Sequence, residues 1–491
     1  MSSNFRRELL LMDRSQLRRH QAERLRDLLR QVSATNSFWR AKWDAAGVDL
    51  SESAIDSLQV PGDLTRLPLT TKAELVADHQ AHPPYGSNLT FDVERYSRLH
   101  QTSGTTGEPL RWLDTPESWQ WVLDCWEQNF ELAGLKTSDR LCFPFSFGPF
   151  LGFWAAFEGA ARLGRLCLPG GGMSSESRLK FIEENQATVI CCTPTYALRL
   201  AEVAADLKID LKSGSVRMLI VAGEPGGSVP SIRQRIEEAW GARVIDHWGM
   251  TEIGPLGNEC VENPHGLHLL ETECLVEIID PVSGQPFDLD ASIAGNVAVI
   301  APRDEPNGQA MPIAQTTSNA RSAHHAERDG YVNAAPIRGE LVITTFGRVG
   351  TPVIRYRTGD LVELDPAPCP CGRSLLRLKG GILNRIDDMI TIRGNNVFPT
   401  AIEAILREFS EIIEYRLNVA TGRSMQVLKI EVETTFGLPH TNAGEDRLSA
   451  LLDRVEAAIH DRLHFHSELI IVEPGALPRH ELKGRRIQRL P

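Results

Sequence analysis

The feature that most constrains the fold is a regular alternation of short apolar segments with amphipathic ones between residues 140 and 245. The apolar segments have the length and composition of strands, and they cover Leu141–Phe145, Arg165–Leu168, Thr188–Cys192, Met218–Ala222 and Ala242–Ile245. Helical patterns lie between them, near 150–163, 176–186, 196–206 and 229–240. This alternation predicts a parallel sheet covered by helices, which is a doubly wound α/β arrangement.

The rest of the chain divides around that segment. Residues 14–32 look helical, and the chain beyond about 266 is β-rich, with strands expected at Leu275–Ile279 and Gly339–Ile343. A polar excursion near 302–336 has little periodicity. A last unit has helical patterns at Ile402–Phe409 and Leu448–Leu463 and a strand pattern at Val427–Glu433. We therefore expect an N-terminal domain, 1–386, of doubly wound sheets plus a β-rich subdomain, and a small α+β C-terminal domain, 387–491.

Composition limits the class of protein. The chain has 491 residues and a net charge of −12, which argues against a general nucleic-acid binder. It contains no apolar run long enough to span a membrane, and its N-terminus lacks the features of a signal peptide. Nine cysteines in a chain of this size favour free thiols or metal ligands over a disulfide framework. A cytoplasmic location is the expectation.

Three short segments have the composition of a nucleotide site. The first is an uncharged loop of hydroxyls and glycines, whose backbone N–H groups suit a phosphate; it consists of Thr102, Ser103, Gly104, Thr105, Thr106 and Gly107. The second runs from Asp246 through Trp248 and Gly249 to Thr251 and Glu252, directly after a strand. The third ends in Asp360, a carboxylate after a tight turn that can accept ribose hydroxyls. Each alone is also compatible with an ordinary turn.

The order and spacing of these segments resemble the adenylate-forming superfamily of acyl-CoA synthetases, and within it the phenylacetate–CoA ligase branch. Further matching segments are Arg385-Ile-Asp-Asp388, Arg393-Gly-Asn-Asn-Val-Phe-Pro399, Cys369-Pro-Cys-Gly372 and Leu477-Pro-Arg479 followed by Lys483-Gly484. The resemblance runs from about residue 20 to the end, excluding the excursion. It implies a ligase that joins a carboxylic acid to ATP as an acyl-adenylate and then transfers the acyl group to CoA.

The resemblance also implies roles for individual residues. The 102–107 loop would hold the β- and γ-phosphates, Thr251 the α-phosphate and Glu252 a Mg²⁺ ion. The adenosine would be bound by Gly223, Glu224, Pro225, Asp246, Trp248, Gly249, Asp360 and Arg385. Trp248 stands where the family usually has a tyrosine against the adenine, and an indole stacks equally well.

The C-terminal domain would be mobile in such an enzyme, because one site has to serve two reactions. Lys483 would reach the adenylation centre and stabilise negative charge there. Asp387 matches the hinge, and Arg393 and Gly394 match the loop that enters for the thiol step. Without the family, Lys483 would be read as part of a solvated basic tail.

A metal site is predicted from the remaining thiols. Cys260 precedes His265 and His268, and Cys369 and Cys371 follow about 100 residues later. Three thiolates and one imidazole form a tetrahedral zinc site. Because the branch has a similar pattern, we expect structural Zn²⁺ at Cys260, His268, Cys369 and Cys371, with His265 as the rival ligand.

The acid is expected to be aromatic, since by similarity Phe147, Gly148 and Phe150 would line an apolar acyl pocket. The chain departs from the family pattern at Glu108, where the phosphate loop often continues with lysine, a charge that Arg111 could replace. Asn384 also replaces the glycine expected before Arg385, and the 302–336 excursion is extra. Together these departures indicate a specialised member, for example of a biosynthetic pathway. The alternatives left open are a carrier-protein thiol or an amine as acceptor, a non-catalytic nucleotide-binding protein, and either a monomer or a homodimer.

Overall fold

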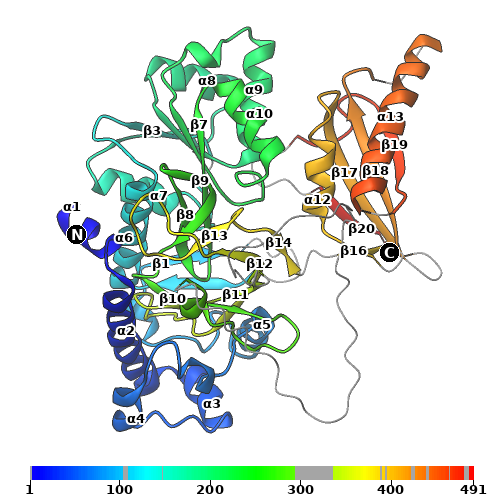
Figure 1. The fold of residues 1–491 in the computed structure, drawn as a ribbon. Coiled ribbons are helices and arrows are strands. Elements are labelled where there is room, and N and C mark those ends of the chain that lie inside the picture. Colours follow the sequence, from blue (N-terminus) through cyan, green and yellow to red (C-terminus); the bar gives the residue numbers. More distant parts are fainter. Residues whose placement is uncertain are drawn as a thin grey trace, which may run out of the picture.

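The computed structural model describes residues 3–102, 109–145, 147–293, 336–386, 390–392, 395–421, 426–437, 442–463, 465–479 and 486–490. Figure 1 shows a large unit that contains the strands up to β14 and a small unit that contains β15 to β20. In the large unit β1 and β2 pair separately from the sheet formed by β3 to β14. The boundary predicted at residue 387 and most of the 302–336 excursion fall outside the described residues.

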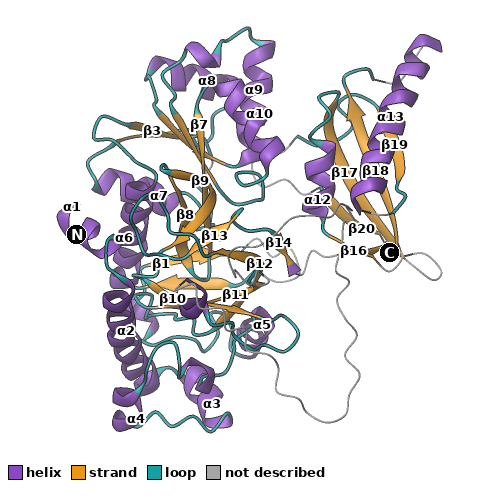
Figure 2. Cartoon of the chain, viewed as in Figure 1, coloured by secondary structure: helices purple, strands orange, loops and turns teal. Residues whose placement is uncertain are grey.

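The N-terminal segment is mainly helical and packs against the large sheet (Figure 2). Asp13 caps the longest of these helices through a capping box with Gln16, and the predicted apolar face of 14–32 is buried as expected. The elements are α1 (Ser3–Leu10), α2 (Arg14–Thr35), α3 (Ser37–Ala45), α4 (Glu52–Ser57), η1 (Leu64–Arg66), α5 (Lys72–Ala81), η2 (Val93–Arg95), the hairpin β1 (Arg98–Gln101) and β2 (Arg111–Asp114), and α6 (Pro116–Leu132).

The predicted parallel sheet is confirmed, with strand order β4-β3-β5-β6-β7. Its strands are β3 (Arg140–Phe143), β4 (Leu166–Pro169), β5 (Val189–Cys192), β6 (Met218–Val221) and β7 (Arg243–Met250). The helices between them are α7 (Trp154–Arg162), α8 (Ser175–Glu184), α9 (Pro194–Asp206), η3 (Leu211–Ser213) and α10 (Pro230–Trp240). Thr193 caps α9 ahead of a proline, and Gly241 in the left-handed region, with φ of 62°, ends α10.

After β7 the sheet continues with antiparallel strands, as the β-rich prediction requires. The order from β7 is β8-β9-β13-β12-β11-β10, with β14 paired to β12. These strands are β8 (Gly254–Cys260), β9 (Asn263–Leu269), β10 (Cys274–Ile279), β11 (Arg338–Thr345), β12 (Tyr356–Asp365), β13 (Arg377–Lys379) and β14 (Asn384–Arg385), with α11 (Leu289–Ile293) after β10. Residues far apart in sequence, such as Trp248 and Asp360, therefore belong to one continuous sheet.

The small unit has its own apolar core around Ile402, Leu417 and Ile430. Its elements are β15 (Ile390–Ile392), β16 (Asn395–Val397), α12 (Pro399–Leu406), β17 (Ile412–Thr421), β18 (Gln426–Thr434), α13 (Asn442–Leu463), β19 (Glu468–Val472) and β20 (Ile487–Leu490). The α+β class predicted for this part of the chain is correct, because two helices and a six-stranded sheet are present among its described residues.

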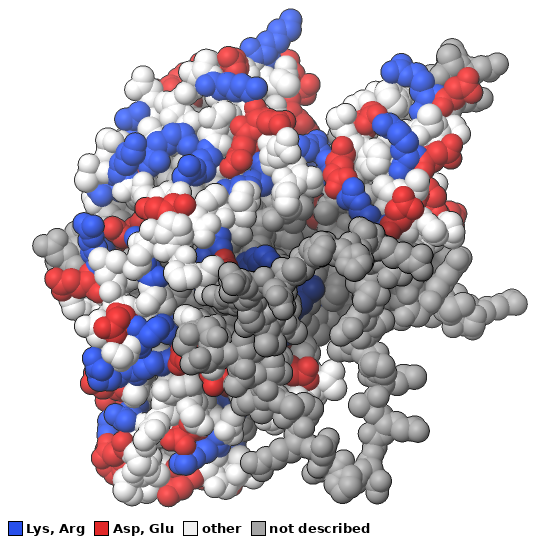
Figure 3. Space-filling model, in the orientation of Figure 1, with Lys and Arg blue, Asp and Glu red and all other residues white. Residues whose placement is uncertain are grey.

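Two surface observations complete the description. Among the described residues, no helix is both long and apolar enough to cross a membrane. On the face shown in Figure 3, acidic and basic side chains are interspersed, which fits a net charge of −12 distributed over the surface.

Candidate active site and metal centre

Asp360 lies where β7 and β12 bring distant residues together. Its Oδ2 accepts a 2.9 Å hydrogen bond from Trp248 Nε1, and its Oδ1 accepts one of 3.1 Å from Arg385 Nη1. Arg385 is the register partner of Asp360 in the β12–β14 pair, so the backbone fixes this contact. Asp360 is 3% exposed, and an ionised carboxylate acts only as a hydrogen-bond acceptor. Three of the predicted adenosine-binding residues thus meet around one buried carboxylate.

Glu252 is the second buried carboxylate of the site. Its Oε1 lies 3.4 Å from the Tyr356 hydroxyl, which donates to it, and 3.4 Å from Lys72 Nζ. Burial, and next the charge of Glu252, raises the pKa of Tyr356 well above its usual value, so its phenol keeps the proton it donates. The carboxylate is thus paired with a cation and a neutral donor.

Lys72 was not predicted from the sequence. It is the first residue of α5, which Thr71 and Glu74 start with a capping box. Thr70 anchors this helix start to the strand that carries Tyr356, because Thr70 N donates to Arg355 O and Arg357 N donates to Thr70 O, both at 2.8 Å. The capping box was a signal for the helix, but nothing in the sequence indicated that it begins at the site.

Arg348 links Thr251 to the β1–β2 hairpin, whose strands flank the predicted phosphate loop. Its Nε and Nη2 donate to the two oxygens of Asp114, at 2.7 and 2.6 Å, and its Nη1 donates to the backbone oxygen of Thr251. Burial alone would raise the pKa of Asp114, but the Arg348 guanidinium outweighs it and holds that pKa below its usual value. Asp114 ends β2, the strand that follows the predicted loop. The first loop residue, Thr102, pairs with Leu110 across the loop base through two 3.0 Å hydrogen bonds.

The turn after β6 contains further residues that were predicted to bind the adenosine. Gly223, with φ of 94°, precedes Glu224 and Pro225, and Glu224 Oε1 accepts a 2.8 Å hydrogen bond from Thr195 N. The Asp246 carboxyl group lies under this turn: a Cβ on Gly227 would be 2.2 Å from Asp246 Oδ1. Burial, and next the neighbouring Glu259, raises the pKa of Asp246 to about 7.

Gly249 was also predicted to bind the adenosine, and close packing requires a glycine at this position. A Cβ there would lie 2.7 Å from Gly254 O, because the β7–β8 connection folds back on it. The close approach of the backbone, rather than a ligand, therefore already explains why a glycine stands here.

The predicted acyl-pocket residues lie between β3 and α7. Phe147 is packed in an aromatic cluster, with ring centroids 4.7 Å from Phe145 and 4.6 Å from Trp154. Trp154 Nε1 donates to Gly148 O at 2.9 Å, which fixes the turn. Phe150 is 43% exposed. Arg111, the predicted substitute cation, donates to Pro84 O and lies on the surface.

The four predicted zinc ligands converge. The ligand atoms of Cys260, His268, Cys369 and Cys371 all lie within 4.8 Å of one another. Cys260 Sγ is 3.7 Å from Cys369 Sγ, and Cys371 Sγ is 3.6 Å from His268 Nε2. Two sulfurs on a tetrahedral Zn²⁺, each at about 2.3 Å, lie roughly 3.8 Å apart, so the spacing fits the ion.

The surroundings of this cluster also suit a metal. His268 Nδ1 faces Leu375 O at 3.3 Å, which leaves Nε2 directed at the sulfurs. The hydrogen bond between Cys260 and Cys371 lowers the pKa of Cys371 and raises that of Cys260, so within this pair the Cys371 thiol loses its proton first. The rival ligand His265 is exposed and is not part of the cluster.

The other predicted site residues lie outside the described residues. They are Ser103, Gly104, Thr105, Thr106, Gly107, Asp387, Arg393, Gly394 and Lys483.

Comparisons with known proteins identify the family to which the chain is related. Residues 18–296 match the family model described as AMP-binding enzyme, and residues 394–489 match the model for the AMP-binding enzyme C-terminal domain. The chain is 30% identical to the phenylacetate–coenzyme A ligase of Thermus thermophilus over 98% of both chains. It is 28% identical to that of Escherichia coli, with 95% of this chain and 93% of the relative covered.

Among solved structures, the chain is similar to 2-hydroxyisobutyryl-CoA ligase in two states. With the postadenylation state bound to 2-HIB-AMP the TM-score is 0.80, at 25% identity. With the thioesterification state bound to 2-HIB-AMP and CoA it is 0.65, at 26% identity. Each comparison covers 100% of this chain and 93% of that one.

Proposed function

Since this chain belongs to the AMP-binding enzyme family, and within it to the phenylacetate–CoA ligase branch of AMP-forming acid–CoA ligases, we propose that the acid it activates is aromatic. The first half-reaction forms a bond between a carboxylate oxygen and the α-phosphorus of ATP while pyrophosphate leaves. In the second, the thiol sulfur of CoA bonds to the acyl carbon and AMP leaves.

The observation that carries the assignment of roles is the meeting of Trp248, Asp360 and Arg385. Asp360 would accept hydrogen bonds from the ribose hydroxyls, while the hydrogen bonds from Trp248 and Arg385 orient its carboxylate. Thr251 would contact the α-phosphate, since Arg348 fixes its backbone. Lys483 would supply the cation for the attack, by the family resemblance alone.

Glu252 fits a Mg²⁺ ligand because it is a buried carboxylate beside the expected phosphate positions. Such an ion would neutralise charge on the leaving phosphates. The Lys72 ammonium lies 3.4 Å from a Glu252 oxygen and brings a positive charge to this carboxylate. In the sequence, Glu108 replaces the lysine that usually continues the phosphate loop. In the absence of nucleotide, Lys72 would balance the Glu252 carboxylate.

We also propose that Cys260, His268, Cys369 and Cys371 bind a structural Zn²⁺ ion. The fit rests on the spacing of their ligand atoms and on the burial of three of the four side chains. The ion would cross-link the end of β8 and strand β9 to the segment between β12 and β13. It would contribute folding free energy and take no part in the reaction.

An aromatic acid is supported by the phenylalanine-rich segment between β3 and α7 and by the names of the relatives, which are phenylacetate–CoA ligases. Phe147 and Gly148 would face the ring of the acid. The 2-hydroxyisobutyryl-CoA ligase structures bind an aliphatic acyl group on a similar fold, so the fold itself does not select the acid.

A panel of benzoic, phenylacetic, anthranilic and short aliphatic acids tests the proposal, read by acid-dependent pyrophosphate release and by thioester formation with CoA. We expect an aromatic acid to give the highest kcat/KM in both readouts. Preference for an aliphatic acid would overturn the substrate assignment. Pyrophosphate release without a CoA thioester would favour a carrier-protein thiol or an amine as acceptor, and no release with any acid would favour a non-catalytic nucleotide-binding protein.

A further inference from the structure

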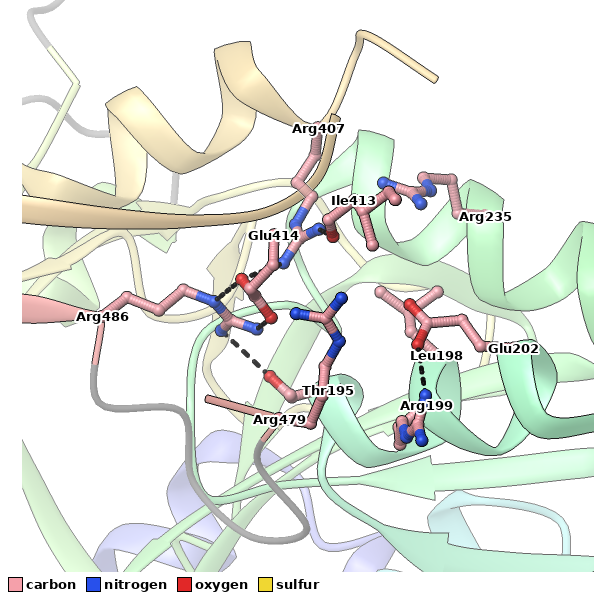
Figure 4. Close-up of a pocket in the computed structure, with 10 residues that line it drawn as sticks. All are labelled: Thr195, Leu198, Arg199, Glu202, Arg235, Arg407, Ile413, Glu414, Arg479 and Arg486. Carbon is pink, nitrogen blue, oxygen red and sulfur yellow. Dashed lines mark hydrogen bonds and ion pairs between the residues drawn. The ribbon is translucent and has the colours of Figure 1, made fainter. Parts of the chain in front are cut away.

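The two sheet units meet across a polar contact near the N-terminus of α9. Figure 4 shows a pocket there, lined by Thr195, Leu198, Arg199, Glu202, Arg235, Arg407, Ile413, Glu414, Arg479 and Arg486. Thr195 and Arg235 belong to the large unit, and Arg407, Glu414 and Arg486 belong to the small one. Within the described residues, a direct hydrogen bond crosses this pocket from Arg486 Nη1 to Thr195 Oγ1, at 3.1 Å.

Arg486 is fixed from its own side of the contact. Its Nε and Nη2 donate to the two oxygens of Glu414, at 2.7 and 3.0 Å, and the guanidinium lies over the Tyr415 ring at 5.3 Å. The side chain is 8% exposed. A guanidinium held by a bidentate carboxylate has a defined plane, which directs its remaining nitrogen, Nη1, at Thr195. Glu403 Oε1 lies 3.7 Å from the same nitrogen.

Thr195 connects this contact to the Gly223–Pro225 turn, which was predicted to bind the adenosine. Its hydroxyl accepts from Arg486, and its backbone N donates to Glu224 Oε1 at 2.8 Å, in the turn that follows β6. On the other side, Arg486 follows Lys483 by three residues in the sequence. The Thr195–Arg486 contact therefore joins the Gly223–Pro225 turn to the base of the segment that carries the expected catalytic lysine.

The same interface contains a feature that opposes tight closure. Arg235 Nη1 is buried and has no hydrogen-bond partner among the described residues. Burial, and next the positive charge of Arg407, lowers the pKa of Arg235, which means that its charge is disfavoured in this arrangement. Besides the Arg486–Thr195 hydrogen bond, Ser231 Oγ donates to Ala404 O at 3.3 Å between the same two units. A contact with few hydrogen bonds, opposed by an unpartnered cation, is suited to forming and breaking during turnover.

We propose that Arg486 is a positioning residue for the adenylation half-reaction, acting through its hydrogen bond to Thr195. The contact holds the small unit beside the Gly223–Pro225 turn during adenylation, and it separates for the thiol step. The whole chain superposes better on a ligase in its postadenylation state than on the same ligase in its thioesterification state, with TM-scores of 0.80 and 0.65. The inference rests on the two-step reaction proposed above.

Thr195→Val tests the contact, with Thr195→Ser as its matched control. Valine keeps the shape of the side chain and removes the acceptor, whereas serine keeps the hydroxyl. With the best acid of the panel, we expect Thr195→Val to lower the kcat of acid-dependent ATP–pyrophosphate exchange about tenfold, with the KM for the acid unchanged. Thiolation of supplied acyl-adenylate by CoA should keep its wild-type rate, and Thr195→Ser should behave as wild type in both assays.

Arg486→Lys gives a second and independent measurement. Lysine keeps the charge but cannot bind Glu414 bidentately while reaching Thr195. If the two residues act through one contact, the Thr195→Val/Arg486→Lys double variant should lose no more exchange activity than Arg486→Lys alone. Additive losses would overturn the proposal, because they would show that the two side chains act separately.

Two further outcomes separate this inference from the proposed function. Wild-type exchange rates in Thr195→Val, or equal losses in exchange and thiolation, would refute the positioning role while leaving the ligase reaction intact. Absence of acid-dependent exchange in the wild-type chain would instead refute the proposed reaction. Retained thiolation in Thr195→Val also demonstrates that the variant is folded.

Discussion

Replacing Asp246 with asparagine should change how the stability of the protein depends on pH. The residue as a whole keeps partial contact with solvent, but its carboxyl group is enclosed under Gly227 and beside Gly381. Burial and the nearby Glu259 raise its pKa from 3.8 to about 7. The native state therefore favours the protonated acid, whereas the unfolded chain ionises it near pH 4.

The sign and size of the effect follow from that difference. Between about pH 4 and pH 7 the native state binds more protons at this site than the unfolded state, so the free energy of unfolding falls as pH rises. A difference of about 3 pKa units corresponds to at most about 4 kcal/mol. Because water reaches part of the residue, we expect roughly half of that, about 2 kcal/mol. The contribution of Asp246 to the free energy of unfolding is fully present below about pH 4 and is lost by about pH 7.

Denaturant unfolding measured at pH 4.5, 6, 7 and 8 provides the assay. All nine tryptophans lie between residues 39 and 248, so their fluorescence reports the large unit alone. Relative to wild type, Asp246→Asn should become more stable by about 2 kcal/mol as pH rises from 4.5 to 8.

A second aspartate provides a control of opposite sign. The backbone N–H of Ser283 lowers the pKa of Asp280, so Asp280 contributes stability that is lost on acidification. The free energy of unfolding of Asp280→Asn should therefore approach the wild-type value only at the acidic end of the pH series. A stability difference between Asp246→Asn and wild type that stays constant across these pH values would refute the reasoning for Asp246.

Three further substitutions test the site. Cys371→Ser should reduce bound zinc from about one ion per chain to substoichiometric levels by metal analysis and lower the unfolding temperature, whereas a wild-type chain purified without zinc would contradict the metal assignment. Lys72→Ala should raise the KM for MgATP more than it lowers kcat, because it removes a cation beside Glu252; an unchanged KM would place Lys72 outside the phosphate site. Trp248→Phe keeps the ring but leaves Asp360 without the indole donor, and we expect weaker AMP binding by calorimetry, by about 1 kcal/mol; equal affinity would show that this hydrogen bond does not prepare the ribose site.

The central parallel strands could be predicted from sequence because β5 and β6 are buried along their whole length and are therefore continuous apolar runs. Strand β8 was missed, since Gly254–Cys260 contains Asn258 and Glu259, which look like loop residues. Both are fully buried, and Glu259 is neutralised by Arg233 at 2.9 Å. A buried ion pair with a partner 26 residues away leaves no local signal in the sequence.

The candidate site shows the same limit. Trp248, Asp360 and the four metal-binding residues stand in motifs whose residue types indicate their chemistry. Lys72, Arg348 and Thr195 do not, because their importance depends on which strand or helix end the fold places beside them. Family resemblance supplied Lys483 and Asp387, which no local pattern distinguishes from surface residues.

The position of the Cys–His cluster within the large sheet has a consequence for the nucleotide site. Trp248 lies on β7 and Asp360 on β12, and the strands between them in the sheet are β8, β9 and β13. The four cluster residues join the end of β8 and strand β9 to the segment that connects β12 to β13. The strands that the cluster holds together therefore set the distance between Trp248 and Asp360. Loss of a bound ion would weaken nucleotide binding by changing this distance, although no ligand of the ion contacts the nucleotide.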